Sequence, residues 1–183
     1  MILYDELCNA KSLLDVGTGP GYLPYIINQA FPQIKIVGID PSDEMIRESE
    51  RIVGRNPNIK ILKASAMQIP YENESFDLII STFSIKHWED VGKGLSEVYR
   101  VLKNNGKFWC VDLDKNADSS KLDRMFQITS PVYKFFAKYI IKSTIRSVGA
   151  SSDELNSLLQ KIPFHGKFVS AKFLPIIYAK LSK

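Results

Sequence analysis

Short apolar runs rich in β-branched residues alternate along the chain with longer amphipathic stretches. Runs of this kind predict buried strands, and the stretches of roughly 10 to 15 residues between them predict helices. The expected strands cover residues 12–16, 35–39, 59–63, 76–81 and 106–112. The expected helices cover residues 23–30, 42–53 and 89–102. Strands that alternate with helices in this way indicate an α/β fold with a doubly wound, mostly parallel sheet.

Turn and cap residues mark the ends of several of these elements. Pro32 follows the first expected helix and ends it, because proline cannot continue a helix. Ser42, followed by two acidic residues, is expected to cap the second helix. Asn104, Asn105 and Gly106 are typical turn residues, so we expect a turn there that starts the fifth strand.

The regular alternation stops after Asp112. We expect residues 113–150 to form a helical lid or insertion, with a break at Pro131. A chain of 183 residues has the size of one compact domain, so residues 1–183 are expected to form a single domain that includes this insertion.

The closing part of the chain predicts three more elements. Residues 152–161 are expected to form a helix, and two strand-like runs follow at residues 164–169 and 171–179. Because only Ser170 separates these two runs, the strands must pair antiparallel.

Charge is distributed unevenly around a net value of +4. Residues 1–112 hold 12 basic and 15 acidic residues, whereas residues 113–183 hold 12 basic and 5 acidic residues. An anionic partner is therefore expected only near the C-terminal part. In this part four basic residues recur at every fourth position, namely Lys134, Lys138, Lys142 and Arg146. Such a ridge could contact an anionic membrane or a phosphate backbone, or it could be the solvated face of a lid helix.

The cysteines and the apolar segments limit the classes of protein to which the chain can belong. Cys8 and Cys110 lie far apart and belong to no metal-ligand spacing, so we expect neither a disulfide framework nor a bound metal. No run reaches the roughly 18 apolar residues of a membrane span, and the N-terminal residues lack the basic start of a signal peptide. We therefore expect a soluble, cytoplasmic protein.

The most informative segment is residues 13–22, with the sequence LLDVGTGPGY. Gly17, Gly19 and Gly21 follow a buried strand, and such glycines let the backbone turn sharply and approach a ligand closely. The third glycine comes one residue too early for the dinucleotide pattern G-x-G-x-x-G. Asp15 places a carboxylate at the end of the strand, which would repel a pyrophosphate but suits a ligand with an ammonium and a sulfonium group. S-adenosylmethionine carries both groups.

A second acidic residue ends the next strand. Asp40 follows an apolar run and lies 23 residues after Gly17. A carboxylate in this place can accept hydrogen bonds from both hydroxyls of a ribose. Dinucleotide-binding folds share this device, and Asp40 could instead cap the helix that begins near Ser42.

Five motifs between residue 12 and about residue 112 resemble the class I S-adenosylmethionine-dependent methyltransferases, in particular the small-molecule group that includes the quinone C-methyltransferases. The motifs are LLDVGTGPGYLP, IVGIDPSDEMI, KASAMQIPYENESFDLIIS, SIKHWED and EVYRVLKNNGKFW. The resemblance implies a Rossmann-like sheet of about seven strands with an antiparallel C-terminal strand and a helical insertion after the fifth strand. It also implies methyl transfer from S-adenosylmethionine to an O or C atom of a small acceptor, including lipophilic acceptors.

The resemblance also implies which residues bind the cofactor. Asp15 and the glycine turn would hold the methionine portion, Asp40 the ribose, and Met45 would lie against the adenine unless it is a core residue. The full implied set is Asp15, Gly17, Thr18, Gly19, Gly21, Tyr22, Asp40, Pro41, Met45, Ser65, Ala66, Met67, Ser81 and Phe83. Ser65 stands where the family usually has an acidic residue, so the adenine amine would meet a neutral partner.

His87 is the candidate catalytic residue, because it follows the fourth strand at the edge where such folds build their substrate pockets. Histidine exchanges protons near neutral pH, so His87 could take a proton from the acceptor, or it could be a packing residue at a helix start. Asp112 at the end of the fifth strand could contact the substrate, or it could cap the element that follows. His165 and Cys110 are interpreted as structural.

Two other functions stay open. The basic C-terminal part could serve a nucleic-acid methyltransferase, but Ser81, Thr82, Phe83 and Ser84 stand where many such enzymes have an N/D-P-P-Y run. Nucleic acid is therefore not the expected partner. The other alternative is a module that binds the cofactor without turnover. The sequence does not indicate an oligomeric state.

Overall fold

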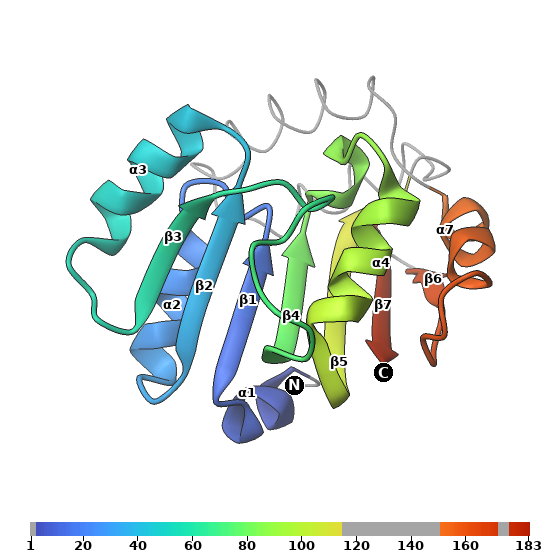
Figure 1. Cartoon of the computed structure of the whole chain (residues 1–183), viewed down its shortest axis with the longest axis horizontal. Coiled ribbons are helices and arrows are strands. Elements are labelled where there is room, and N and C mark those ends of the chain that lie inside the picture. Colours follow the sequence, from blue (N-terminus) through green and yellow to red (C-terminus); the bar gives the residue numbers. More distant parts are fainter. Residues whose placement is uncertain (1–2, 115–150, 172–175) are drawn as a thin grey trace.

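The computed structural model describes residues 3–114, 151–171 and 176–183. Its centre is one sheet of seven strands in the order β3-β2-β1-β4-β5-β7-β6 (Figure 1). The strands are β1 Ser12–Val16, β2 Lys35–Asp40, β3 Ile59–Lys63, β4 Phe76–Thr82, β5 Leu102–Leu113, β6 Phe168–Ser170 and β7 Ile176–Ser182. The first five strands are parallel, whereas β7 runs antiparallel to β5, and β6 runs antiparallel to β7. The predicted fold class is confirmed.

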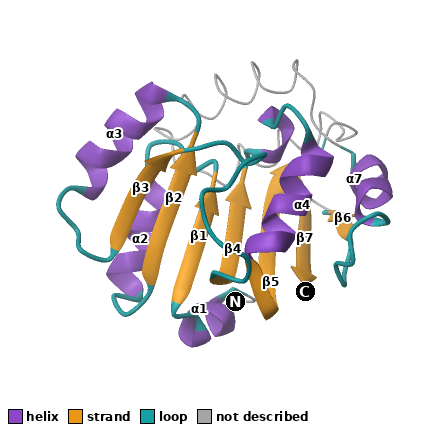
Figure 2. Cartoon of the chain, in the orientation of Figure 1, coloured by secondary structure: helices purple, strands orange, loops and turns teal. Residues whose placement is uncertain are grey.

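Helices cover both faces of this sheet (Figure 2). The described helices are α1 Tyr4–Asn9, α2 Tyr22–Ala30, α3 Asp43–Val53, α4 Val91–Val101 and α7 Ser152–Leu159, with a short 3-10 helix η1 Ile85–His87. One hydrophobic cluster joins α4 and α7 to the sheet, and a second cluster joins α1 and α2 to the sheet. Because side chains on both sides of the central strands are covered, β1 and β4 consist of nearly continuous apolar runs.

Local signals account for the starts of two helices. The Met45 backbone N–H donates to Ser42 Oγ over 3.4 Å, which is the predicted cap of α3. Ser151 and Glu154 form a capping box at the start of α7, in which each side chain accepts from the backbone of the other residue. These caps satisfy N–H groups that have no partner inside a helix.

The predicted turn at residues 104–106 does not start β5. The strand begins at Leu102, and its pairing with β4 shifts from Phe76 opposite Leu102 to Leu78 opposite Lys107. Asn105 adopts a left-handed conformation with φ 64°, which asparagine tolerates better than most residues. The turn residues therefore form an irregularity inside β5.

The remaining boundaries differ from the predicted ones by a few residues. Helix α7 ends at Leu159 rather than at residue 161, and β6 and β7 replace the predicted runs at 164–169 and 171–179. The predicted antiparallel pairing is confirmed, with Phe168 opposite Ala179. His165 forms an isolated backbone bridge with Ser182, in agreement with a structural role. Helix α1 was not predicted from the sequence.

The predicted lid or insertion at residues 113–150 begins within the described end of β5 and lies, from residue 115 onward, outside the described residues. The break at Pro131 lies outside them too, as does the basic ridge of Lys134, Lys138, Lys142 and Arg146. All three therefore stay predictions.

Both cysteines are free thiols, one exposed and one buried. Burial raises the pKa of the Cys110 thiol well above its usual range, so this residue stays protonated inside β5. Within residues 3–114, 151–171 and 176–183, no helix has the length and apolar character needed to cross a membrane.

The order of the strands creates a switch point. The chain runs from β1 to β2 and β3 on one side and then returns to β4 on the other side of β1. In open α/β sheets, ligands bind outside the carboxyl ends of the strands at such a point. The site described next lies there.

Candidate active site

A cavity of about 690 Å³ lies at the carboxyl ends of β1, β2, β3 and β4. This volume is typical of small-molecule sites, which measure roughly 300–1,000 Å³. The lining residues are Gly17, Thr18, Gly19, Pro20, Tyr22, Leu23, Asp40, Pro41, Met45, Ala64, Ser65, Ala66, Met67, Thr82, Phe83, Ser84, His87, Trp88 and Glu89. The fold thus brings together 12 of the 15 predicted site residues, His87 included.

Three predicted residues do not line the cavity. Asp15 and Ser81 are fully buried, with 1% and 0% of their surface exposed. Gly21 packs against α3, because a Cβ at this position would lie 2.9 Å from Ser49 Cβ. Side chains alternate along a strand, so the last residues of a strand need not face the space beyond its end.

The Asp15 carboxylate is buried and only partly satisfied. Thr18 Oγ1 donates to Asp15 Oδ2 over 2.8 Å, whereas Asp15 Oδ1 has no hydrogen-bond partner among the described residues. Burial raises the pKa of Asp15 to about 7, and the negative charge of Asp40 adds to the rise, while the Thr18 hydroxyl acts in the opposite direction. Such an oxygen is costly unless something else binds it.

The Asp40 carboxylate joins two loops of the site. Its Oδ2 accepts from the Gly19 backbone N–H over 3.0 Å, and its Oδ1 accepts from the Ser42 backbone N–H over 2.9 Å. Asp40 therefore stabilises the turn before α3 and also holds the glycine turn. The sequence analysis missed the bond to Gly19.

The glycine turn is built on the end of β2. The backbone N–H groups of Gly17 and Thr18 both donate to the Ile39 carbonyl over 2.9 Å. A Cβ on Gly19 would have no neighbour within 4 Å, so this residue faces open space. Gly38 in β2 leaves room for the Thr18 hydroxyl, because a Cβ there would lie 2.7 Å from Thr18 Oγ1. Gly38 is a site-building residue that the sequence analysis missed.

The turn after β3 uses its own serine. Ser65 Oγ accepts from the Met67 backbone N–H over 3.1 Å and lies 3.5 Å from Met67 Sδ. The Ser65 hydroxyl thus stabilises the local turn at the wall of the cavity. Its position leaves the neighbouring Ala66 as a small, apolar part of the same wall.

An arginine in α4 holds the segment that follows this turn. Arg100 donates to the carbonyls of Tyr71 and Ile69 over 2.7 and 3.0 Å, and it forms an ion pair with Glu97. The Glu97 carboxylate in turn accepts from the Ile69 backbone N–H over 2.9 Å. Hydrogen bonds to Glu97 raise the pKa of Arg100. This network was not predicted, because its partners lie far apart in the sequence.

The segment after β4 forms the opposite wall. Phe83 is half exposed and adopts a left-handed conformation with φ 55°, and its backbone N–H donates to the Val111 carbonyl over 2.8 Å. A bulky residue in this conformation is uncommon and signals a constrained segment. His87 follows in η1, is exposed and lines the cavity.

Asp112 is the other predicted candidate at this end of the sheet, and it does not line the cavity. It is fully buried, and its carboxylate accepts from the backbone N–H groups of Lys86 and Leu113 over 3.4 and 2.7 Å. The Lys86 ammonium lies 4.0 Å from Asp112 Oδ1 and is buried as well. Burial raises the pKa of Asp112 and lowers the pKa of Lys86.

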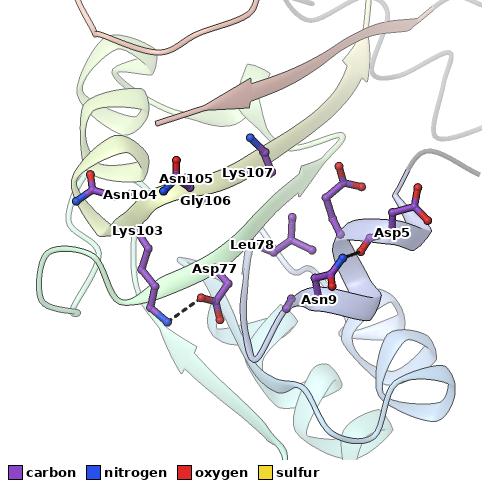
Figure 3. A pocket seen from close by; sticks show the side chains of 11 residues that line it. Asp5, Asn9, Asp77, Leu78, Lys103, Asn104, Asn105, Gly106 and Lys107 are labelled. Carbon is purple, nitrogen blue, oxygen red and sulfur yellow. Dashed lines mark hydrogen bonds and ion pairs between the residues drawn. The ribbon is translucent and has the colours of Figure 1, made fainter.

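A second hollow, of about 410 Å³, lies at the opposite end of β4 (Figure 3). It contains an ion pair between Asp77 and Lys103, whose atoms lie 2.9 Å apart, and none of the predicted site residues. We therefore assign no chemistry to this hollow. Among the residues that the structure describes, no group of three or more metal-ligating side chains comes together.

Residues 14–110, more than half of the chain, match the methyltransferase domain family. The chain belongs to this family. The matched part of the methyltransferase domain runs from β1 into β5 and contains every residue that lines the cavity. The resemblance to class I S-adenosylmethionine-dependent methyltransferases is thus confirmed for the family and the fold.

Two curated methyltransferases are similar to this chain. The ubiquinone/menaquinone biosynthesis C-methyltransferase UbiE of Rickettsia prowazekii is 28% identical over 159 residues, which are 83% of this chain and 61% of the relative. The demethylmenaquinone methyltransferase of Chlorobaculum tepidum is 32% identical over 112 residues, which are 60% of this chain and 45% of the relative. The methyltransferase chain therefore spans less than two thirds of the length of either relative.

A solved structure agrees with the fold. The S-adenosylmethionine-dependent methyltransferase from Aquifex aeolicus superposes with a TM-score of 0.67 at 21% identity, over 93% of this chain and 81% of the other. The arrangement of strands is therefore that of a methyltransferase domain.

Proposed function

We propose that the protein transfers a methyl group from S-adenosylmethionine to a carbon or oxygen atom of a small, quinone-type acceptor. One observation carries the proposal: the glycine turn, the end of β2, the turn after β3 and the segment after β4 all line a single cavity. The names of the curated relatives, a ubiquinone/menaquinone biosynthesis C-methyltransferase and a demethylmenaquinone methyltransferase, support the class of acceptor.

The residues present fit the cofactor. Asp15 Oδ1 is a buried oxygen without a partner in the part of the chain that the structure describes, and Asp40 adds a second carboxylate close to the glycine turn. Two carboxylates suit the ammonium and sulfonium charges of S-adenosylmethionine. Gly19 faces open space, so the backbone of the turn is accessible to a ligand.

Each part of the cavity is assigned a part of the cofactor. The turn from Gly17 to Gly21, together with Asp15 and Ser81, would hold the methionine portion, and Asp40 would hold the ribose. The adenine would lie between residues 41–45 and residues 65–67, of which Pro41, Met45, Ser65, Ala66 and Met67 line the cavity. Thr18, Tyr22 and Phe83 complete the proposed set. When bound, S-adenosylmethionine supplies a methyl group on a positively charged sulfur atom.

The walls on the acceptor side suit a flat, apolar molecule. Phe83 and Trp88, which follow β4, contribute aromatic surface to the cavity. Aromatic rings stack on the faces of other rings, so a quinol ring would be oriented by these side chains. Orientation of the attacking atom and exclusion of water are the main demands of methyl transfer.

His87 is the proposed catalytic residue. The acceptor loses a proton from its hydroxyl group or ring carbon as it gains the methyl group, and the His87 imidazole would take this proton. Its place in η1 at the cavity wall supports the assignment.

The proposal extends to the organisation of the chain. Strands from both halves, β1 and β7 among them, join one sheet, which supports a single methyltransferase domain over residues 1–183. Two free thiols support a cytoplasmic location. No described feature favours nucleic acid as the partner, since the chain has Ser81, Thr82, Phe83 and Ser84 after β4 in place of an N/D-P-P-Y run.

Isothermal titration with S-adenosylmethionine and S-adenosylhomocysteine tests the first step, and binding of both below millimolar concentration is the expected result. The second step is incubation with isotopically labelled S-adenosylmethionine and a soluble hydroquinone, with mass spectrometry of the product. Absence of binding at 1 mM would overturn the proposal, and binding without transfer to any quinol would reduce the protein to a cofactor-binding module.

The role of His87 has a matched control in His165, which lies far away in the C-terminal region. His87→Ala should slow turnover by about 10²–10⁴-fold, the usual contribution of a general base, and should leave cofactor affinity unchanged. His165→Ala should leave both quantities unchanged. Equal turnover rates in the two variants would remove His87 from the mechanism.

A further inference from the structure

The cofactor turn and the acceptor-side segment touch at one point, between Gly17 and Ser84. A Cβ on Gly17 would lie 1.8 Å from Ser84 Oγ and 2.4 Å from Ser84 Cβ. The Ser84 side chain thus occupies the space that a side chain at residue 17 would need. Gly17 also has φ 76°, a conformation that glycine adopts without strain. The position of the turn therefore depends on where Ser84 lies.

Trp88 fixes the Ser84 side chain. The indole Nε1–H of Trp88 donates to Ser84 Oγ over 3.0 Å, and both residues are more than 90% buried. A serine side chain otherwise has three staggered rotamers of similar energy. The hydrogen bond selects the rotamer that rests against Gly17.

Trp88 is itself held in place by α4. A Cβ on Gly94 would lie 2.4 Å from Trp88 Cε3, so the indole ring lies directly on the helix backbone. A continuous line of contacts therefore runs from α4 through Trp88 and Ser84 to Gly17. The Ser84 carbonyl also accepts from the His87 backbone N–H over 2.9 Å, which ties η1 to the same unit.

We propose that Trp88 is a positioning residue for the cofactor turn, acting through the Ser84 hydroxyl. The indole N–H keeps Ser84 against Gly17, and this contact holds the turn in the conformation that receives S-adenosylmethionine. The identity of the ligand rests on the function proposed above. Since Trp88 also lines the cavity on the acceptor side, the same side chain connects the two halves of the site.

Two substitutions separate the hydrogen bond from simple packing. Trp88→Phe keeps an aromatic ring on Gly94 but removes the N–H, and Ser84→Ala removes the acceptor and keeps the Cβ that contacts Gly17. Each should weaken S-adenosylhomocysteine binding about 10-fold, the effect of leaving one buried polar group unpaired. The double variant should bind no more weakly than either single variant, because both changes break the same bond.

The chain offers a matched control in Trp109. Its Nε1 is buried but has no hydrogen-bond partner among the described residues. Trp109→Phe therefore makes the same chemical change without breaking any hydrogen bond to a described residue, and the dissociation constant of this variant should equal that of the wild type. Thermal unfolding of every variant checks that the fold is kept.

Hydrogen exchange provides a measurement without any ligand. The amides of Gly17 and Thr18 are bonded to the Ile39 carbonyl, so they report directly on the order of the turn. They should exchange faster in Trp88→Phe than in Trp109→Phe, while amides in β2 stay equally protected in both.

The outcomes distinguish this inference from the proposed function. A wild-type protein that binds neither S-adenosylmethionine nor S-adenosylhomocysteine overturns the proposed function. A wild type that binds, together with a Trp88→Phe variant of equal affinity, overturns only the role of Trp88. Equal exchange rates at Gly17 in Trp88→Phe and Trp109→Phe overturn that role even without ligand data.

Discussion

Gly19 and Asp40 are joined by a hydrogen bond of 3.0 Å that links loops 21 residues apart in the sequence. The other oxygen of Asp40 receives the Ser42 backbone N–H, so one carboxylate satisfies donors from two loops. A group with two acceptor oxygens is needed in this place. An amide can offer only one acceptor oxygen, and its NH₂ group would face an N–H donor.

Asp40→Asn should therefore lower the free energy of unfolding by about 1–3 kcal/mol, because one backbone N–H loses its partner. It should also raise the dissociation constant of S-adenosylhomocysteine at least 10-fold. Urea unfolding and calorimetric titration measure the two effects. Asp90→Asn is the matched control, since Asp90 caps α4 and asparagine caps a helix about equally well. Equal effects of the two substitutions would contradict the prediction.

The raised pKa of Asp15 makes the stability of the protein depend on pH. The pKa is about 7 in the folded protein and 3.8 without the fold, so between these values the folded state retains a proton that the unfolded chain has lost. The contribution of Asp15 to stability is thus complete below about pH 4 and is lost as the pH rises to about 7. Asp15→Asn should remove this dependence.

Urea unfolding of the wild type and of Asp15→Asn at pH 5, 6 and 7 tests whether the contribution of Asp15 to stability falls as the pH rises. The free energy of unfolding of the variant should rise relative to that of the wild type by up to about 1.4 kcal/mol per pH unit in this range. Addition of the positively charged cofactor should favour the ionised carboxylate and release a proton near pH 6.5. Parallel stability curves for the two proteins would show that Asp15 is ionised in the folded state.

Arg100→Lys should lower the free energy of unfolding by about 1–2 kcal/mol, because an ammonium cannot replace a guanidinium that donates to two carbonyls and a carboxylate together. Arg51→Lys is the control. Arg51 forms an exposed ion pair with Glu48 three residues away, and such pairs contribute little. In thermal and urea unfolding, Arg100→Lys should be clearly less stable than Arg51→Lys. The reverse order of stability would contradict the prediction.

Lys86→Met and Asp112→Asn test the buried pair at the end of β5. Each single substitution should cost about 3–5 kcal/mol, since it leaves a buried charge without its partner. The double variant should be less destabilised than the sum of the two single effects. Urea unfolding of the three variants measures the coupling, and strictly additive effects would show that the two charges do not interact.

The first four strands follow the predicted boundaries within one residue, because each is a short, mostly apolar run that can be recognised from its own residues. The fifth strand differs, since Asn105 and Gly106 are turn residues that the strand accommodates as an irregularity in its pairing with Phe76 and Leu78. The turn residues alone do not show that the strand continues through them. The pairing that decides it involves a strand about 30 residues earlier in the chain.

The candidate site also contains parts that could be predicted from the sequence and parts that depend on contacts made by the fold. The place of the glycine turn and Asp40 at the cavity could be predicted, because both lie in short stretches of sequence that directly follow a strand. Arg100 and Lys86 were missed, because their partners Ile69 and Asp112 lie far from them in the sequence. Trp88 was missed because its partner Ser84, although close in the sequence, acts on the distant Gly17. Asp15 and Ser81 were expected to take part in the site, but both are buried and neither lines the cavity, so their contact with a ligand stays a proposal.

The central position of β1 also affects how the protein is made. Ser12–Val16 leave the ribosome before β4, which is one of the two neighbours of this strand and follows more than 60 residues later. At about 5–20 residues per second, one edge of a very apolar strand stays open for several seconds during synthesis. Whether the nascent chain aggregates therefore depends on how long that edge is shielded from other chains.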